Sequence, residues 1–196
     1  MDKKILRKEM IRKRDELSPL EIQNLSEKVI LRVIESDIYK NSKNIFTFVS
    51  FKREVFTHNF IKNSIINGKK IFIPHIIDKT MHPVELKDFK DLEIGFYNIL
   101  SMPEDKIKIS KGDEIDLVIV PGLIFGKNMY RIGYGGGYYD KFLSNKEISA
   151  YKLGICYDFQ VIDEIQNDIY DIPVDKIITD KRIIERIWIW IELKGL

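Results

Sequence analysis

The stretch from Arg131 to Asp140 (RIGYGGGYYD) contains the densest group of residues that could take part in chemistry. Glycine lacks a Cβ atom and reaches backbone conformations with positive φ, so several N–H groups can converge on one anion. The start of a following helix adds the positive end of its dipole. The stretch therefore predicts a phosphate site on its glycines, which are Gly133, Gly135, Gly136 and Gly137.

Two charged residues flank these glycines. Arg131 could add a charge-assisted, bidentate contact to phosphate oxygens. Asp140 falls in the first turn of the predicted helix, where its carboxylate could hold a hard cation such as magnesium. A flexible surface turn is the alternative for an isolated glycine cluster. The two charges and the buried strand predicted before the stretch favour a site for ATP and magnesium.

Two common nucleotide-binding motifs are excluded. The segment from Gly122 to Asn128 has the wrong spacing for a P-loop and lacks the Ser or Thr that would hold magnesium. Tyr138 stands where a dinucleotide-binding G-x-G-x-x-G motif requires its third glycine. The phosphate site must therefore be a less common kind of loop.

The amino terminus is strongly basic. Helical spacing puts Lys3 and Arg7 on one face of a helix. Such a face could contact nucleotide phosphates, could bind nucleic acid, or could simply be solvated. The positive residues of this segment are Lys3, Lys4, Arg7, Lys8, Arg12, Lys13 and Arg14.

Isolated acidic residues and histidines complete the candidates. Glu54 follows the carboxyl end of the first predicted strand, where open α/β sheets bind their ligands. Asp171 and Asp175 lie just before and at the start of another predicted strand and could supply a second carboxylate to a metal, or form a surface turn. The histidines show no metal-ligand spacing and are interpreted as structural; they are His58, His75 and His82.

Alternating strands and helices must position these residues. Strands predicted over residues 44–50 and 70–74, with a helix over 57–66 between them, form a βαβ unit with parallel strands. We therefore predict an α/β fold with a doubly wound, mostly parallel sheet. The other predicted strands cover 116–121, 151–157 and 174–179; the other helices cover 2–17, 19–36, which begins with a capping box, and 139–143.

Two segments are less regular. Residues 78–114 show no sustained period and are predicted to form loops and short strands. The tail, residues 183–193, would be apolar on both faces if extended, so Trp188 and Trp190 lie either in a buried strand or on a contact surface.

Length and composition set limits. The chain of 196 residues is long enough for one core and short for two, which predicts a single domain over residues 1–196. A formal charge of +2 gives no overall attraction to nucleic acid or to an anionic membrane. The single cysteine, Cys156, fits a reducing compartment. No window approaches the roughly 20 apolar residues that span a bilayer. We expect a soluble, cytoplasmic protein.

Several ordered motifs together resemble the 5-formyltetrahydrofolate cyclo-ligase family, also called 5,10-methenyltetrahydrofolate synthetase. The likeness runs nearly end to end, and the glycine-rich block is its most characteristic part. The motifs are the Lys3-Lys4-Ile5-Leu6-Arg7 start, Glu54 followed by Thr57, the Pro121-Gly122-Leu123 turn, the Arg131 to Asp140 block, and Asp171-Ile172-Pro173-Val174-Asp175.

The resemblance implies an ATP-driven closure of 5-formyltetrahydrofolate to 5,10-methenyltetrahydrofolate with magnesium present, by a monomer whose fold is related to ribose-phosphate isomerase and CoA-transferase domains. Arg131 and Lys4 would stabilise the transition state, and Asp140 and Asp171 would hold magnesium. The folate-binding residues would be Val49, Glu54, Tyr97, Tyr138 and Tyr139. The ATP-binding residues would be Lys3, Lys4, Arg7, Arg131, Ile132, Gly133, Tyr134, Gly135, Gly136, Gly137, Tyr138 and Tyr139.

The sequence also departs from the family pattern. Gly126 stands where aspartate is usual and Met129 where glycine is usual, and His75, Leu100 and Met102 replace an arginine and two prolines. Two other functions stay open: an ATP-dependent phosphotransferase or ligase with another substrate, and a nucleic-acid-binding module that stacks bases on Tyr134, Tyr138 and Tyr139.

Overall fold

A computed structural model describes residues 2–95 and 99–186. Its main sheet is mixed but mostly parallel: the five central strands run parallel, and only the two edge strands, β12 and β3, are antiparallel to their neighbours. The predicted α/β fold with a mostly parallel sheet is thus confirmed. In spatial order the strands are β12 (Ile183–Glu185), β11 (Lys176–Ile178), β9 (Tyr151–Ile155), β6 (Leu117–Val120), β1 (Asn44–Thr47), β2 (Lys70–Ile77) and β3 (Thr80–Leu86).

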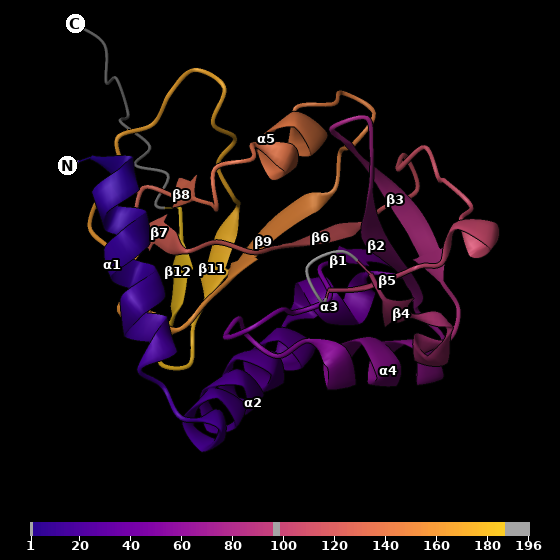
Figure 1. Cartoon of the computed structure of the whole chain (residues 1–196), viewed down its shortest axis with the longest axis horizontal. Helices are drawn as coiled ribbons and strands as arrows, with labels where there is room; N and C mark the ends of the chain where they lie inside the picture. Colours follow the sequence, from indigo (N-terminus) through magenta and orange to yellow (C-terminus); the bar gives the residue numbers. More distant parts are fainter. Residues whose placement is uncertain (1, 96–98, 187–196) are drawn as a thin grey trace, which may run out of the picture.

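Helices pack on both faces of this sheet (Figure 1). Alternate residues of each strand point to opposite faces, so Ile45 packs with α2 and α4 while Phe46 packs with α5. Ser18 and Glu21 form the predicted capping box at the start of α2. The helices are α1 (Lys3–Asp15), α2 (Pro19–Glu35), α3 (Asp37–Asn41), α4 (His58–Ile66) and α5 (Tyr138–Leu143).

Smaller elements complete the fold. A second sheet of three short strands, in the order β10-β7-β8, packs under α1 through Met10, Leu123 and Ile132. The tail predicted over 183–193 begins as β12, whereas Trp188 and Trp190 lie outside the described residues. The remaining elements are β4 (Glu93–Ile94), β5 (Leu100–Ser101), β7 (Ile124–Gly126), β8 (Arg131–Ile132), β10 (Val161–Ile162), and the 3-10 turns η1 (Phe89–Asp91), η3 (Glu104–Lys106) and η4 (Asp158–Gln160).

The β2–β3 hairpin corrects the sequence-based prediction. Strand β2 continues three residues beyond the predicted end at Pro74, and β3 is a regular strand of 7 residues in a segment predicted to be loops and short strands. Pro83 pairs with Pro74 and breaks the usual strand pattern, but β3 lies at the edge of the sheet, where proline is tolerated. Asp78 and Lys79 turn the chain with φ values of 47° and 60°, a turn usually marked by glycine.

Replacing Lys79 with glycine is expected to stabilise the protein. A residue other than glycine in the left-handed region is strained by about 1 kcal/mol, so the free energy of unfolding should rise by roughly 0.5–1 kcal/mol in urea titrations. Lys79→Ala is the control, because it removes the charge but keeps the Cβ atom. An equal gain in both variants would show that charge, and not backbone strain, is responsible.

Among residues 2–95 and 99–186, no helix combines the length and apolar character that crossing a membrane requires.

Candidate functional site

The predicted phosphate site is a loop between β8 and α5. Gly135 and Gly137 adopt φ values of 107° and 67°, which residues with side chains rarely adopt. A Cβ atom added to Gly133 or Gly137 would meet no other atom within 4 Å, so the backbone is open to a ligand at both positions. Helix α5 has only 6 residues, so the backbone N–H groups of the loop, more than a helix dipole, make this surface suitable for an anion.

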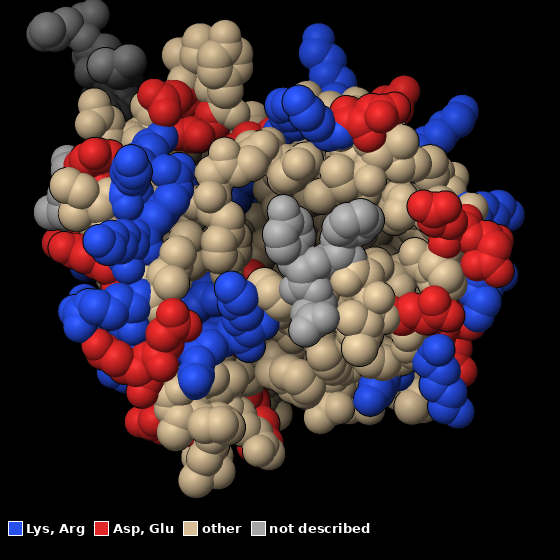
Figure 2. Space-filling model, viewed as in Figure 1, with Lys and Arg blue, Asp and Glu red and all other residues tan. Residues whose placement is uncertain are grey.

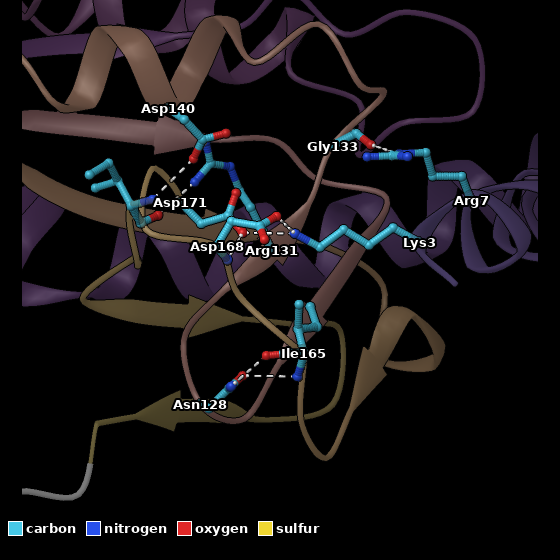
Figure 3. A network of polar contacts seen from close by, with 10 residues as sticks. Lys3, Arg7, Asn128, Arg131, Gly133, Asp140, Ile165, Asp168 and Asp171 are labelled. Atoms are coloured by element: carbon cyan, nitrogen blue, oxygen red, sulfur yellow. Dashed lines mark hydrogen bonds and ion pairs between the residues drawn. The ribbon is translucent and has the colours of Figure 1, made fainter. Parts of the chain in front are cut away.

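One stripe of α1 faces this loop and the segment before β11. Lys3 Nζ lies 2.8 Å from Asp168 Oδ2 and 2.9 Å from Asp171 Oδ2. One turn further, Arg7 Nε donates to the carbonyl oxygen of Gly133 at 2.9 Å. Figure 3 shows both side chains reaching from the helix toward these partners. Lys4 is exposed. Lysine and arginine side chains gather on the side of the molecule where α1 lies (Figure 2).

Arg131 is buried rather than exposed to the loop surface, with a side chain only 4% accessible. Its guanidinium donates to the carbonyl oxygen of Ile172 at 2.8 Å and pairs with Asp140 Oδ1 at 3.0 Å. Burial lowers the pKa of Arg131, and the charge of Asp140 opposes this shift. Arg131 therefore joins the start of α5 to the segment before β11; its contact with ATP phosphates stays a prediction.

Asp140 and Asp171, the predicted magnesium ligands, both lie close to Arg131 (Figure 3): Asp140 pairs with its guanidinium, and Asp171 precedes Ile172, whose carbonyl oxygen accepts from it. Asp140 Oδ1 also accepts from the N–H of Ile172 at 3.1 Å, and Asp171 Oδ2 accepts from the N–H of Asp168 at 2.8 Å. Burial alone raises the pKa of Asp171, but that N–H group and Lys3 bring it below its usual value.

The predicted magnesium ligands are two carboxylates, Asp140 and Asp171. The described part of the chain contains no group of three or more His, Cys, Asp or Glu side chains that could hold a metal ion. Magnesium commonly binds through one or two carboxylates together with the phosphates of a nucleotide. A magnesium ion that binds together with ATP would need no further carboxylates from the protein, and the role of Asp140 and Asp171 as its ligands stays a prediction.

Glu54 lies at the carboxyl end of the sheet, as predicted, and contacts the glycine-rich loop. Its Oε1 accepts from the Tyr134 hydroxyl at 3.0 Å and its Oε2 from the N–H of Phe51 at 2.9 Å. Burial raises the pKa of Glu54, although these two hydrogen bonds and the charge of Arg14 oppose it. Tyr134 therefore connects the glycine-rich loop, which is predicted to bind ATP, with Glu54, which is predicted to bind folate.

The other predicted folate residues have different surroundings. Val49 is buried in the main core. Tyr138 and Tyr139 pack partly against the core on the α5 side. The Tyr139 hydroxyl is buried, has no hydrogen-bond partner among the described residues, and has a raised pKa because of burial. Tyr97 lies outside the described residues. For all four, contact with folate stays a prediction.

Arg14 also belongs to this site, a role that its place in the basic amino-terminal segment does not reveal by itself. Its Nη2 donates to the Tyr134 hydroxyl at 2.9 Å, and the residue is 4% exposed. The spacing contained a signal: Lys3, Arg7, Met10 and Arg14 follow one another by four, three and four positions, which is one face of a helix.

Two departures from the family pattern fit the local backbone. A Cβ atom at Gly126 would lie 2.2 Å from Asn128 Oδ1 and 3.0 Å from the Ile165 nitrogen, so a larger residue does not fit there. Met129 has a φ of 72°, in the region that favours glycine, but its side chain is buried in the core. Burial of the methionine side chain offsets the strain of this conformation.

Comparison with known proteins identifies the same family that the sequence motifs resemble. The model of the 5-formyltetrahydrofolate cyclo-ligase family matches residues 1–180. The 5-formyltetrahydrofolate cyclo-ligase of Mycoplasma genitalium is 33% identical over 180 residues, covering 91% of this chain and 98% of the relative. The mouse 5-formyltetrahydrofolate cyclo-ligase is 31% identical over 159 residues, covering 75% of this chain and 78% of the relative.

Solved structures agree in fold. The 5,10-methenyltetrahydrofolate synthetase of Aquifex aeolicus superposes with a TM-score of 0.83 at 31% identity, covering 94% of this chain and 93% of the other. That of Mycoplasma pneumoniae gives 0.75 at 28% identity, covering 92% and 100%. With the match over residues 1–180, these likenesses show that the chain belongs to the 5-formyltetrahydrofolate cyclo-ligase family.

Proposed function

We propose that this protein converts 5-formyltetrahydrofolate and ATP to 5,10-methenyltetrahydrofolate, ADP and phosphate, with magnesium. Family membership supports this activity. The observation that most supports this activity is the hydrogen bond of 3.0 Å from Tyr134 to Glu54. It brings the glycine-rich loop, proposed to bind ATP, next to the acidic residue proposed to bind the folate. ATP bound to the loop and a folate bound beside Glu54 would therefore be neighbours.

The chemistry needs such proximity. A formamide oxygen is a poor leaving group until it is phosphorylated, so the γ-phosphoryl group is first transferred to the formyl oxygen and ADP is released. The nitrogen at position 10 then attacks the formyl carbon and loses its proton, and the carbon–oxygen bond breaks to release phosphate. Both steps depend on positioning and on neutralising charge more than on a protein nucleophile.

On the nucleotide side, Lys3, Lys4, Arg7 and the loop from Arg131 to Tyr139 would bind the phosphates of ATP. Arg131 and Lys4 would stabilise the charge that develops as the γ-phosphoryl group moves. Arg131 also holds Asp140 at 3.0 Å, which supports a second role in orienting a magnesium ligand. Asp140 and Asp171 would bind the magnesium that accompanies ATP and neutralises its phosphates.

On the folate side, Val49, Glu54, Tyr97, Tyr138 and Tyr139 would line the pocket. Glu54 is the ionisable carboxylate among them, and in its charged form it can accept hydrogen bonds from N–H groups of the folate.

The direct test is formation of the methenyl product, followed by its absorbance. We expect product to accumulate when 5-formyltetrahydrofolate, ATP and magnesium are all present, and none when any one is omitted. A folded preparation that forms no product with all three would contradict the proposal. Thermal protection by ATP without protection by the folate would then favour a phosphotransferase or ligase with another substrate.

The domain organisation, oligomeric state and location of the enzyme are inferred as well. We infer one domain over residues 1–196, a fold related to ribose-phosphate isomerase and CoA-transferase domains, and a basic amino-terminal helix that serves the nucleotide site. The enzyme would act as a monomer in the cytoplasm, without a nucleic-acid or membrane partner. Light scattering after gel filtration should give a mass near 23.1 kDa, and a dimer mass would contradict the monomer.

A further inference from the structure

Arg14 is a buried cation that makes no direct ion pair within the described part of the chain. The residue is 4% exposed, and within residues 2–95 and 99–186 it forms no ion pair. Its Nε is buried and has no hydrogen-bond partner among the described residues. Burying a charge in this way is unfavourable unless nearby groups compensate for it. Groups that do not pair with Arg14 directly must therefore compensate for its charge.

The groups around Arg14 connect α1 with the glycine-rich loop and with Glu54. Its Nη2 donates to the Tyr134 hydroxyl at 2.9 Å, and its Cζ lies 5.8 Å from the centre of the Tyr134 ring. The same hydroxyl donates to Glu54 Oε1 at 3.0 Å. The Tyr134 hydroxyl thus accepts a hydrogen bond from a cation on one side and donates one to a carboxylate on the other. This order of donors requires Glu54 to act as an acceptor.

Arg14 is too enclosed to contact a substrate directly. It lines a cavity of about 10 Å³ together with Glu54, Pro121, Gly122 and Ile155. That volume is at the lower limit for one water molecule, whereas small-molecule sites occupy several hundred Å³. Any effect of Arg14 on the reaction must therefore pass through Tyr134 and Glu54.

We propose that Arg14 is a positioning residue. It fixes the Tyr134 hydroxyl against Glu54 and so holds the glycine-rich loop, proposed to bind ATP, in a fixed position relative to Glu54, proposed to bind the folate. This inference rests on the proposed function, because it gives Glu54 the role of a charged acceptor for the folate. It adds the last turn of α1 to a site for which sequence reasoning used only the first two turns.

The arrangement has an electrostatic consequence. Burial raises the pKa of Glu54, and Arg14 and Tyr134 both oppose that shift. Within residues 2–95 and 99–186, the other ionisable groups that act on Glu54 are Tyr139, whose pKa is itself raised by burial, and Tyr157, whose hydroxyl donates to the Glu54 carbonyl oxygen at 2.9 Å. Neither tyrosine carries a positive charge. Arg14 is thus the cation that favours the charged form of Glu54.

The test compares the pH dependence of kcat/KM for the folate in Arg14→Met and in the wild type. Activity that needs charged Glu54 falls as the pH drops through the pKa of Glu54. Removing the cation raises that pKa further, so the acidic limb of the profile should move upward by at least about 0.5 pH unit. Arg14→Lys should move it less, because lysine keeps the charge.

Three comparisons separate this role from a merely structural one. Arg12→Met is the matched control, because Arg12 lies on the same helix but is exposed and paired with Glu16 at 2.7 Å. Its profile should stay in place. Tyr134→Phe should also move the limb upward, and the double variant should move it by less than the sum of the two. A profile of Arg14→Met that coincides with that of Arg12→Met would overturn the proposal, whatever the melting temperatures are.

A second measurement does not depend on turnover. In the NMR titration of the Glu54 carboxyl carbon, assigned through Glu54→Gln, the midpoint should rise in Arg14→Met relative to the wild type. If the wild type forms no methenyl product, the proposed function fails, but this titration still tests the contact between Arg14 and Glu54. An unchanged midpoint in a folded Arg14→Met variant would refute the positioning role by itself.

Discussion

Asp140→Asn is expected to lower kcat at least about 100-fold while the protein stays folded, which is the usual loss when one preorganised electrostatic group is removed. Asparagine keeps an oxygen in the place of Oδ1, so the contacts with Arg131 and with the N–H of Ile172 can persist. It removes the negative charge that would bind magnesium. Measured against magnesium concentration, the variant should also need more of the metal to reach its own maximum.

The asparagine variant is more informative than Asp140→Ala. Both substitutions remove the charge beside Arg131, but alanine also removes the oxygen that accepts from this buried guanidinium, whose side chain is only 4% accessible. Removing one partner of a buried pair typically destabilises a protein by about 3–5 kcal/mol, so lost activity in Asp140→Ala could reflect unfolding.

Asp163→Asn is the control for charge alone. Asp163 pairs with Lys127 at 2.6 Å, but its side chain is 90% exposed, and such surface pairs contribute little. Its activity should equal that of the wild type. Wild-type turnover in Asp140→Asn would remove Asp140 from the magnesium site.

The parts of the fold that the sequence predicted well are those fixed by local patterns. Ser18 and Glu21 form a capping box because both partners lie within four residues, and β1 and β6 show as buried apolar runs. Strand β3 was missed because its identity depends on pairing with β2. Its turn residues, Asp78 and Lys79, are not the usual ones for positive φ.

The candidate site divides in the same way. The glycine-rich loop could be recognised because adjacent glycines point to one physical use. The partners of Arg131 could not be predicted from the sequence, because Asp140 and Ile172 reach it only after α5 and the segment before β11 are packed together. The link from Arg14 to Glu54 joins residues that lie far apart in the sequence and that the fold connects through Tyr134. Spacing predicts the face of a helix, but not what that face will contact.

The glycine-rich loop allows a second large effect to be separated from stability. Gly137 and Gly68 have similar positive φ values, 67° and 78°, and a Cβ atom would meet nothing within 4 Å at either position. Alanine should therefore destabilise the protein by a similar amount in both, about 1 kcal/mol in urea titrations. Gly68 follows α4, whereas Gly137 lies in the proposed phosphate loop.

If phosphates bind against the backbone of the loop, the two variants should differ in activity. The methyl group of Gly137→Ala would occupy space that the phosphates need, so KM for ATP should rise at least about 10-fold, which corresponds to a loss of about 1.4 kcal/mol of binding. KM for ATP should not change in Gly68→Ala. Equal KM values in the two variants would mean that the phosphates of ATP do not approach Gly137. Gly133→Ala, where φ is not positive and the space is equally open, would then show whether they bind at the other end of the loop.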